Sequence, residues 1–185
     1  FHGRGGQGAV TAAAMLAAAL LEEGKYAVSI PSFGFERRGA PVVSFLRCSD
    51  REIRQLTNIY TPDCLICVDP TLAKTVDIFG GLKPGGTLVQ ATNKPLAEVA
   101  LSPSVATVGL CDAIGIALQI FSKPITNTLM LGAFARTTGV VSLDALKRSL
   151  EDSDFRDAGL KQNLLALERG YNETAVYQIP QRAAA

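Results

Sequence analysis

The sequence has few of the residues from which a self-contained catalytic centre is usually built. Its 185 residues include one histidine, His2, and no companion residues for a zinc site or a Ser-His-Asp triad accompany it. It also has no signal peptide and no apolar run of the roughly 18 residues needed to span a bilayer. A formal net charge of +1 favours neither nucleic acid nor an anionic membrane as a partner. We therefore expect a cytoplasmic protein without nucleic-acid binding or membrane insertion.

Cysteines are few and scattered, at positions 48, 64, 67 and 111, so they predict buried thiols rather than a disulfide framework. Cys64 and Cys67 form a C-x-x-C pattern, but they lie in a strand-like run, where residues three apart point to opposite faces of a sheet. A shared metal is therefore not expected. The chain also has neither a cysteine series with iron–sulfur spacing nor an acidic motif that would anchor a metal-bound diphosphate.

What the sequence does have is glycine at its start. Residues 1–8 contain four glycines and run directly into an alanine-rich helix, an arrangement that brings backbone N–H groups together around an anion. Gly3, Gly5 and Gly8 match the G-x-G-x-x-G dinucleotide fingerprint, which also requires a carboxylate at the end of the second strand. That strand ends at residues 28–32 without one, which argues against a nicotinamide or flavin site. A tight turn with only a packing role stays open.

The pattern along the chain predicts an α/β fold. We expect helices at residues 9–21, 70–80, 112–121, 125–136, 143–150 and 157–169, and strands at 26–30, 42–48, 64–68, 87–91 and 105–108. Alternating elements favour a Rossmann-like, three-layer α/β/α domain with helices on both faces of a mostly parallel sheet. The strand at 42–48 is expected to be antiparallel, because a loop and not a crossover helix precedes it.

The domain boundaries also follow from this pattern. Residues 1–170 are predicted to form one domain, and 171–185 a tail that packs on a neighbour or frays. The absence of an initiating methionine, together with a start at the end of the first strand, predicts that the native chain begins earlier.

Two loops are expected to share the edge of the sheet where parallel strands end. The glycine loop follows the first strand, and the loop at residues 31–41 follows the second, which brings Arg4, Arg37 and Arg38 within reach of one another. Guanidinium groups beside exposed N–H groups suit a phosphate-bearing ligand or an acidic surface of another subunit. The alternative, that residues 36–38 form a solvated loop tip, stays open.

Several motifs together resemble a known family. They are residues 1–13 (FHGRGGQGAVTAA), 31–42 (PSFGFERRGAPV), 59–63 (IYTPD) and 69–72 (DPTL). In this order they resemble the gamma subunit of 2-oxoacid:acceptor oxidoreductases, of the pyruvate:ferredoxin, 2-oxoisovalerate and phenylglyoxylate type. Weaker similarity continues through Asn127 to about Gly170, so the resemblance covers nearly the whole chain.

The resemblance implies a part of a larger enzyme, with little activity of its own. Such enzymes oxidatively decarboxylate a 2-oxoacid with coenzyme A to an acyl-CoA and CO₂, and pass electrons to ferredoxin or to an NAD-linked acceptor subunit. Thiamine diphosphate, Mg and 4Fe-4S clusters are expected on the alpha, beta and ferredoxin-like delta subunits. On this chain the resemblance assigns a contact with coenzyme A or with another subunit to the following residues: Gly3, Arg4, Gly5, Gly6, Gln7, Gly8, Glu36, Arg37 and Arg38.

Two other classes of function remain compatible with the sequence. A stand-alone nucleotide-binding enzyme would need an acid–base pair near the glycine loop, where only Glu36 and His2 are available. A purely structural or regulatory module would bind no ligand at all. The particular 2-oxoacid cannot be read from this chain, because the residues that select it are expected on other subunits.

Overall fold

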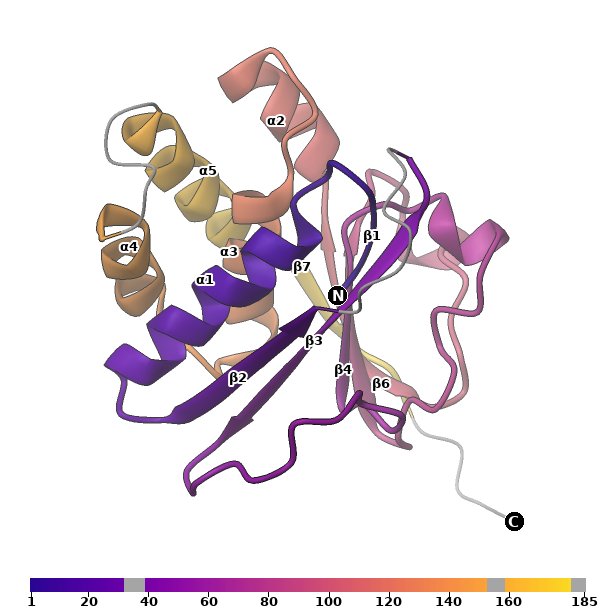
Figure 1. Cartoon of the computed structure of the whole chain (residues 1–185). Coiled ribbons are helices and arrows are strands. Elements are labelled where there is room, and N and C mark those ends of the chain that lie inside the picture. Colours follow the sequence, from indigo (N-terminus) through magenta and orange to yellow (C-terminus); the bar gives the residue numbers. More distant parts are fainter. Residues whose placement is uncertain (32–38, 153–158, 181–185) are drawn as a thin grey trace.

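A seven-stranded sheet forms the centre of the protein (Figure 1), which we describe from a computed structural model at residues 1–31, 39–152 and 159–180. The strands lie in the order β2-β3-β1-β4-β5-β6-β7. Their bounds are β1 His2–Arg4, β2 Tyr26–Pro31, β3 Pro41–Ser49, β4 Cys64–Cys67, β5 Gly86–Ala91, β6 Val105–Cys111 and β7 Ala175–Gln178. β1, β2, β4, β5 and β6 run in one direction, and β3 and β7 run in the other. The predicted α/β class with a mostly parallel sheet is confirmed.

β3 confirms the prediction of an antiparallel strand at residues 42–48. It pairs antiparallel with β2 on one side and with β1 on the other. The chain returns from β2 to β3 without a crossover helix, so β3 can only run back alongside β2. β3 therefore separates β2 from β1, although α1 (Ala9–Glu22) connects those two strands as a crossover helix.

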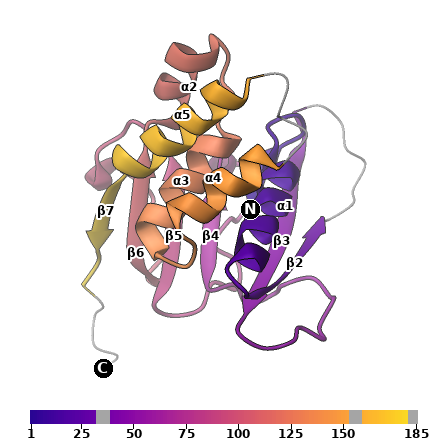
Figure 2. The same ribbon diagram turned by 90° about the vertical axis from the view of Figure 1, so that its left-hand side faces the viewer.

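The α-helices of the described residues gather on one face of the sheet (Figures 1 and 2). They are α1 together with α2 Ala113–Phe121, α3 Asn127–Thr138, α4 Leu143–Glu151 and α5 Leu160–Asn172, each close to its predicted range. Ala12, Ala13 and Ala19 of α1 are fully buried, and the main hydrophobic core lies on this face of the sheet. The other face of the sheet carries a smaller core around Leu65, Leu88 and Val108.

The predicted helix at residues 70–80 is wrong, and with it the expectation of α-helices on both faces of the sheet. Only a 3₁₀ turn at Leu72–Lys74 follows β4, and another at Leu96–Glu98 follows β5. Thr71, Thr75 and Val76 have low helix propensity. The buried side chains of this segment, Leu72 and Ile78, are six residues apart, a spacing that does not place them on one face of a helix.

The predicted C-terminal tail is also partly wrong. α5 continues to Asn172, and β7 then pairs antiparallel with β6, with Thr107 opposite Gln178 and Leu110 opposite Ala175. Because α5 ends beside β6, a short turn is enough to start an antiparallel edge strand. Among the described residues, no helix is both long enough and apolar enough to cross a membrane.

The start of α4 offers a local test of the fold. The Ser142 hydroxyl accepts a hydrogen bond from the backbone N–H of Ala145 at 3.1 Å and so caps the helix. Ser142→Ala is expected to lower the free energy of unfolding by about 1 kcal/mol, measured by urea denaturation, because one N–H loses its partner. Ser142→Asp, which keeps a capping oxygen, should stay near wild type. Equal losses in both variants would contradict the capping role.

Candidate functional site

The glycine loop is a tight turn between β1 and α1. The backbone N–H of Gln7 donates to the Arg4 carbonyl at 3.0 Å and closes the turn. Gly6 and Gly8 have positive φ angles of 91° and 77°, which side chains disfavour. Gly3 is required for a different reason, since a Cβ there would lie 2.7 Å from Cγ2 of Val68. These glycines therefore fix the shape of the backbone whatever the loop binds.

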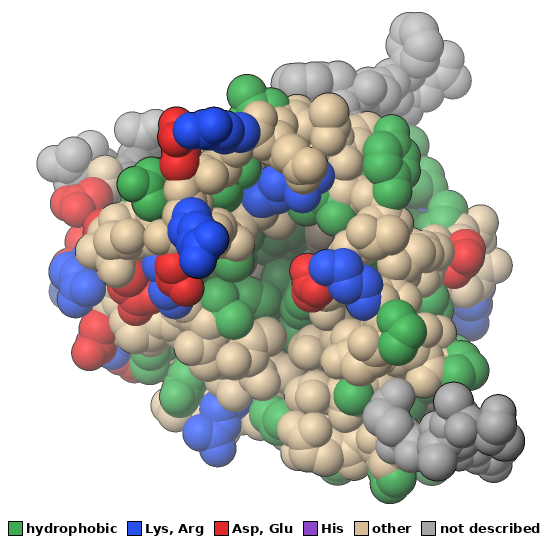
Figure 3. Space-filling model, turned by 90° about the horizontal axis from the view of Figure 1, so that it is seen from below, with side chains coloured by type: hydrophobic (Ala, Val, Ile, Leu, Met, Phe, Trp, Pro, Cys, Tyr) green, Lys and Arg blue, Asp and Glu red, His purple; other side chains and the backbone are tan. Residues whose placement is uncertain are grey.

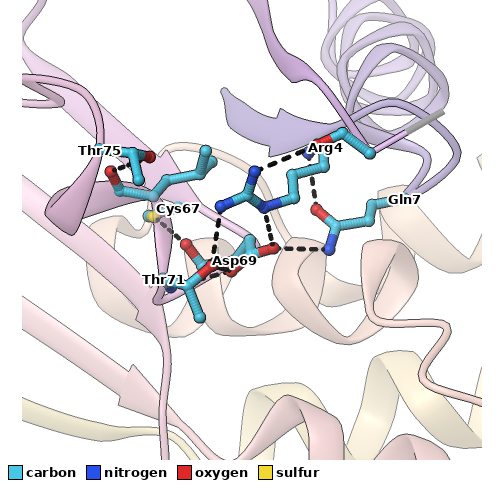
Figure 4. A network of polar contacts seen from close by, with 8 residues as sticks. Arg4, Gln7, Cys67, Asp69, Thr71 and Thr75 are labelled. Atoms are coloured by element: carbon cyan, nitrogen blue, oxygen red, sulfur yellow. Dashed lines mark hydrogen bonds and ion pairs between the residues drawn. The ribbon is translucent and has the colours of Figure 1, made fainter. Parts of the chain in front are cut away.

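Arg4 anchors this turn to the end of β4 (Figure 4). Its Nε donates to Oδ2 of Asp69 at 3.0 Å, Nη1 to the Gly39 carbonyl at 3.1 Å, and Nη2 to Oγ1 of Thr71 at 3.0 Å. Gln7 completes the network, because its Oε1 accepts from the Arg4 backbone N–H at 2.7 Å and its Nε2 donates to Oδ2 of Asp69 at 2.9 Å. Each of the three guanidinium nitrogens thus already has a partner, so Arg4 and Gln7 hold the loop in shape.

Asp69 is the centre of the network. Its Oδ1 accepts from the backbone N–H of Thr71 at 2.8 Å and from the Thr71 hydroxyl at 2.6 Å, while Oδ2 accepts from Arg4 and Gln7. Burial alone would raise the pKa of Asp69, but the hydrogen bonds from Thr71 and Gln7 and the charge of Arg4 outweigh it, and the pKa is lowered. From the sequence, Asp69 was placed only in the motif at residues 69–72, with no role in the site. The available signal was an Asp-Pro-Thr run directly after a buried strand.

A second cluster lies where three helices begin. Gly8 is the N-cap of α1, Asn127 is the first residue of α3, and Gly159 is the N-cap of α5. Asn127 packs on Gly8, where a Cβ would lie 2.9 Å from Nδ2 of Asn127. The side chain of Asn127 is buried, and its Oδ1 has no hydrogen-bond partner within the described part of the chain. Sequence reasoning missed this contact.

A cavity of about 280 Å³ opens beside Asn127. It is lined by Phe121, Lys123, Ile125, Asn127, Gly159, Gln162 and Asn163. The first turns of α1, α3 and α5 contain no acidic residue, so the partial positive charges of these helix ends are not neutralised by their own side chains. Together with Lys123, the ends of α3 and α5 at Asn127 and Gly159 make the cavity suitable for an anionic group.

The predicted arginine loop is only partly placed. Glu36, Arg37 and Arg38 lie outside the described residues. The residues that follow them are described: the backbone N–H of Gly5 donates to the Ala40 carbonyl at 2.9 Å, and the N–H of Gly39 donates to the Gly5 carbonyl at 3.1 Å. The glycine loop and the end of the arginine loop therefore lie side by side, as the sequence predicted.

The sheet order argues further against a dinucleotide site. In a dinucleotide-binding fold the ribose carboxylate follows the strand that lies parallel beside the first one. Here β3 occupies that place and runs antiparallel to β1, so the end of β2 is displaced by one strand. Gly3, Gly5 and Gly8 therefore match the fingerprint, but the position that would hold the ribose carboxylate is not beside them.

Burial controls the protonation of Cys64, Cys67 and His2. Within residues 1–31, 39–152 and 159–180, no group of three or more His, Cys, Asp or Glu side chains could hold a metal ion. Burial raises the pKa of the Cys64 thiol to about 12 and that of Cys67 to about 11, which leaves both protonated. Cys67 and Cys111 are buried as predicted, whereas Cys48 is exposed. Burial, together with the nearby N-terminal ammonium, lowers the pKa of His2 to about 4.

Comparison with known proteins agrees with the resemblance read from the motifs. A sequence model of the pyruvate ferredoxin/flavodoxin oxidoreductase family matches residues 1–173. The NADH-dependent phenylglyoxylate dehydrogenase subunit gamma of Aromatoleum evansii is 77% identical over 185 residues, which covers 100% of this chain and 97% of that protein. The pyruvate/ketoisovalerate oxidoreductases common subunit gamma of Thermococcus kodakarensis is 48% identical over 181 residues, 97% of each chain.

A solved structure has the same fold over nearly its whole length. Pyruvate oxidoreductase subunit PORC from Thermotoga maritima superposes with a TM-score of 0.82 at 37% sequence identity, and the match covers 96% of both chains. The match to the family model, the similarity to the relatives and the shared fold agree that this chain belongs to the pyruvate ferredoxin/flavodoxin oxidoreductase family.

Proposed function

We propose that this chain is the gamma subunit of a multisubunit oxidoreductase that converts phenylglyoxylate, or a closely similar aromatic 2-oxoacid, with coenzyme A to the acyl-CoA and CO₂. The observation that carries the choice of substrate is the 77% identity to the phenylglyoxylate dehydrogenase subunit, against 48% to a pyruvate/ketoisovalerate subunit. Electrons pass to NAD or ferredoxin. Thiamine diphosphate, Mg and the 4Fe-4S clusters are held by the alpha, beta and delta subunits, in the cytoplasm.

The role of this chain in the reaction is to bind and position coenzyme A. The cavity beside Asn127 offers the N-terminal ends of α3 and α5 and the ammonium of Lys123, a suitable environment for a phosphate group. Oδ1 of Asn127 is a buried acceptor with no partner among the described residues, and an N–H or O–H of the bound molecule would satisfy it. The Arg4–Asp69 network keeps the glycine loop in the shape that places Gly8 against Asn127.

The assembly is tested by purification. The tagged chain, isolated without oxygen from its native host, should bring with it near-stoichiometric subunits that contain thiamine diphosphate and iron–sulfur clusters, identified by mass spectrometry. The purified complex should reduce NAD or an artificial electron acceptor with phenylglyoxylate and coenzyme A faster than with pyruvate. A lone monomer or homodimer would reject the proposal, and faster turnover of pyruvate would reject the aromatic substrate.

Lys123→Glu in the complex is expected to raise the KM for coenzyme A about tenfold, because a hydrogen bond to a charged group is worth about 1.5 kcal/mol or more. The KM for the 2-oxoacid should not change, since that substrate is bound elsewhere. Steady-state kinetics with each substrate varied separately give both constants. Lys94→Glu, another exposed lysine that does not line the cavity, serves as the control. An unchanged KM for coenzyme A in Lys123→Glu would contradict the cavity as its binding site.

The arginine loop is tested separately. Replacing both Arg37 and Arg38 by alanine should raise the KM for coenzyme A or weaken assembly of the complex, because guanidinium groups pair with phosphates and with acidic surfaces. Kinetics and analytical size-exclusion chromatography distinguish the two effects. If neither changes, residues 36–38 are a solvated loop tip with no part in the function.

A further inference from the structure

The cavity beside Asn127 is too small for a whole coenzyme A molecule. Its volume is about 280 Å³. Drug-sized ligands occupy pockets of about 300–1,000 Å³, and coenzyme A, with a nucleotide at one end and a long pantetheine chain at the other, is at least as large as these. The cavity can therefore enclose one part of coenzyme A, and its chemistry decides which part.

The cavity lies at the edge of the sheet where α/β folds bind their ligands, since Asn127 contacts Gly8 at the end of the glycine loop. A larger hollow of about 1220 Å³ opens on the underside of the protein (Figure 3), where β4 and β5 begin. The two spaces share no lining residue within the described part of the chain. Each has its own lysine, Lys123 in the cavity and Lys83 in the hollow, so the two lysines can be compared.

The charge of the cavity suits a single phosphate group. Lys123 is exposed, makes no ion pair with another described residue, and is the one charged side chain among the described residues that line the cavity. The N-terminal ends of α3 and α5, at Asn127 and Gly159, add partial positive charge, and neither end is capped by a described side chain. One ammonium and two helix ends are the usual surroundings of a bound phosphate.

A phosphate alone would leave Asn127 unsatisfied. The residue is 7% exposed, and its Oδ1 accepts no hydrogen bond from the described residues. An ionised phosphate offers only acceptors, whereas this oxygen needs a donor. Asn163, the other buried amide of the cavity, is already satisfied, because its Nδ2 donates to the Gly159 carbonyl at 3.0 Å and its Oδ1 accepts from the Thr128 hydroxyl at 3.1 Å. The bound group must therefore carry an N–H or O–H close to its negative charge.

One part of coenzyme A meets both requirements. The diphosphate has charge but no donor, and the pantetheine chain has amide and hydroxyl donors but no charge. The adenosine 3′-phosphate end carries a phosphate directly beside the hydroxyl of the ribose and the amino group of adenine. Phe121 and Ile125, which also line the cavity, provide apolar surface for the faces of the purine ring.

Building on the proposed function, we propose that the cavity binds the adenosine 3′-phosphate end of coenzyme A, with the 3′-phosphate at Lys123 and the adenosine beside Asn127. The thiol at the far end of the molecule extends out of this chain toward the subunits that hold thiamine diphosphate. Lys123 is then a specificity-determining residue, because it recognises a phosphate that adenosine 5′-nucleotides and dephospho-coenzyme A lack.

Dephospho-coenzyme A, which lacks only the 3′-phosphate, tests the proposal. Binding to the purified complex is measured by isothermal titration calorimetry without a 2-oxoacid, so no turnover occurs. The wild-type complex should bind dephospho-coenzyme A about tenfold more weakly than coenzyme A, the value of one charge-assisted contact. Lys123→Met should weaken coenzyme A binding about tenfold and leave dephospho-coenzyme A binding unchanged. Lys83→Met, at the other hollow, should keep the wild-type difference.

A second pair of probes separates coenzyme A from other adenine nucleotides. Adenosine 3′,5′-bisphosphate should displace coenzyme A from the complex, and adenosine 5′-diphosphate should bind about tenfold more weakly. Equal affinity for the two probes would overturn the proposal and make the cavity a general site for adenine nucleotides.

The effect of Lys123→Met also distinguishes this proposal from the proposed function. Equal weakening of coenzyme A and dephospho-coenzyme A would place a different phosphate at Lys123, which overturns the assignment of the 3′-phosphate but leaves the cavity as the coenzyme A site. Unchanged binding of coenzyme A would reject the cavity itself, and with it the role proposed for this chain.

Discussion

Asp69→Ala is expected to lower the free energy of unfolding by about 3 kcal/mol and to loosen the glycine loop. The carboxylate accepts four hydrogen bonds, two from Thr71 and one each from Arg4 and Gln7. The side chain of Asp69 is 11% exposed and that of Arg4 26%. Removing one partner of a buried pair costs about 3–5 kcal/mol, and the partial exposure of Arg4 places this pair at the lower end. Chemical denaturation measures the loss.

The exposed pair Lys83–Asp63 provides the control. Its N–O distance of 2.7 Å is shorter than the 3.0 Å of Arg4–Asp69, but the Asp63 side chain is 81% exposed. Asp63→Ala should therefore cost less than about 1 kcal/mol, since water solvates both charges when the pair is broken. Equal losses in Asp69→Ala and Asp63→Ala would mean that burial and the added hydrogen bonds of Asp69 contribute nothing.

The same carboxylate should make stability depend on pH in the acid range. The pKa of Asp69 is lower in the folded protein than its unfolded value of about 3.9. At a pH between these two pKa values, the unfolded state binds more protons than the folded state. The contribution of Asp69 to the free energy of unfolding is complete above the unfolded pKa and is lost as the pH falls through the folded pKa. Urea denaturation between about pH 2.5 and 6 should show this loss in wild type and in Asp63→Ala. In Asp69→Ala the curve should be flatter.

Local signals in the sequence were sufficient for some elements. Glycine at positions 6 and 8 and the alanines that follow predicted the turn into α1, because backbone conformation and helix propensity act within a few residues. The loop before Pro41 correctly predicted an antiparallel strand. β7 was missed because nothing near Ala175 indicates that β6 offers a free edge. That information depends on the order of the strands in the assembled sheet.

The sequence did not reveal what the side chain of Arg4 contacts. The sequence grouped Arg4 with Arg37 and Arg38 as groups that face a ligand, since charge and position along the chain were the only guides. In the structure Arg4 binds Asp69 and Thr71, which follow a strand that becomes adjacent only on folding. Asn127 was unrecognised for the same reason, because its contact with Gly8 joins distant parts of the chain. Contacts between distant parts of the chain therefore decide which residues hold the site in shape and which are available to a ligand.

Gly132→Ala is expected to lower the free energy of unfolding by about 2–3 kcal/mol, although alanine has a higher helix propensity than glycine. In the interior of an exposed helix the change would stabilise by about 0.5–1 kcal/mol. At Gly132 in α3, however, a Cβ would lie 2.1 Å from the carbonyl oxygen of Leu167 in α5. A Cβ on Gly170 would lie 2.1 Å from the Leu129 carbonyl. These neighbours are backbone atoms that cannot rotate away, so the helices must separate and lose packing.

The double variant tests whether the two glycines form one crossing. Once Gly132→Ala has separated α3 from α5, there is more room for a Cβ at position 170. The double variant should therefore lose less free energy of unfolding than the sum of the two single variants. Lys161→Ala, an exposed position on α5, should stay within about 0.5 kcal/mol of wild type. Full additivity, or a stabilised Gly132→Ala, would contradict close backbone contact. Because α3 begins at Asn127 and α5 follows Gly159, separating them should also widen the cavity at the candidate site.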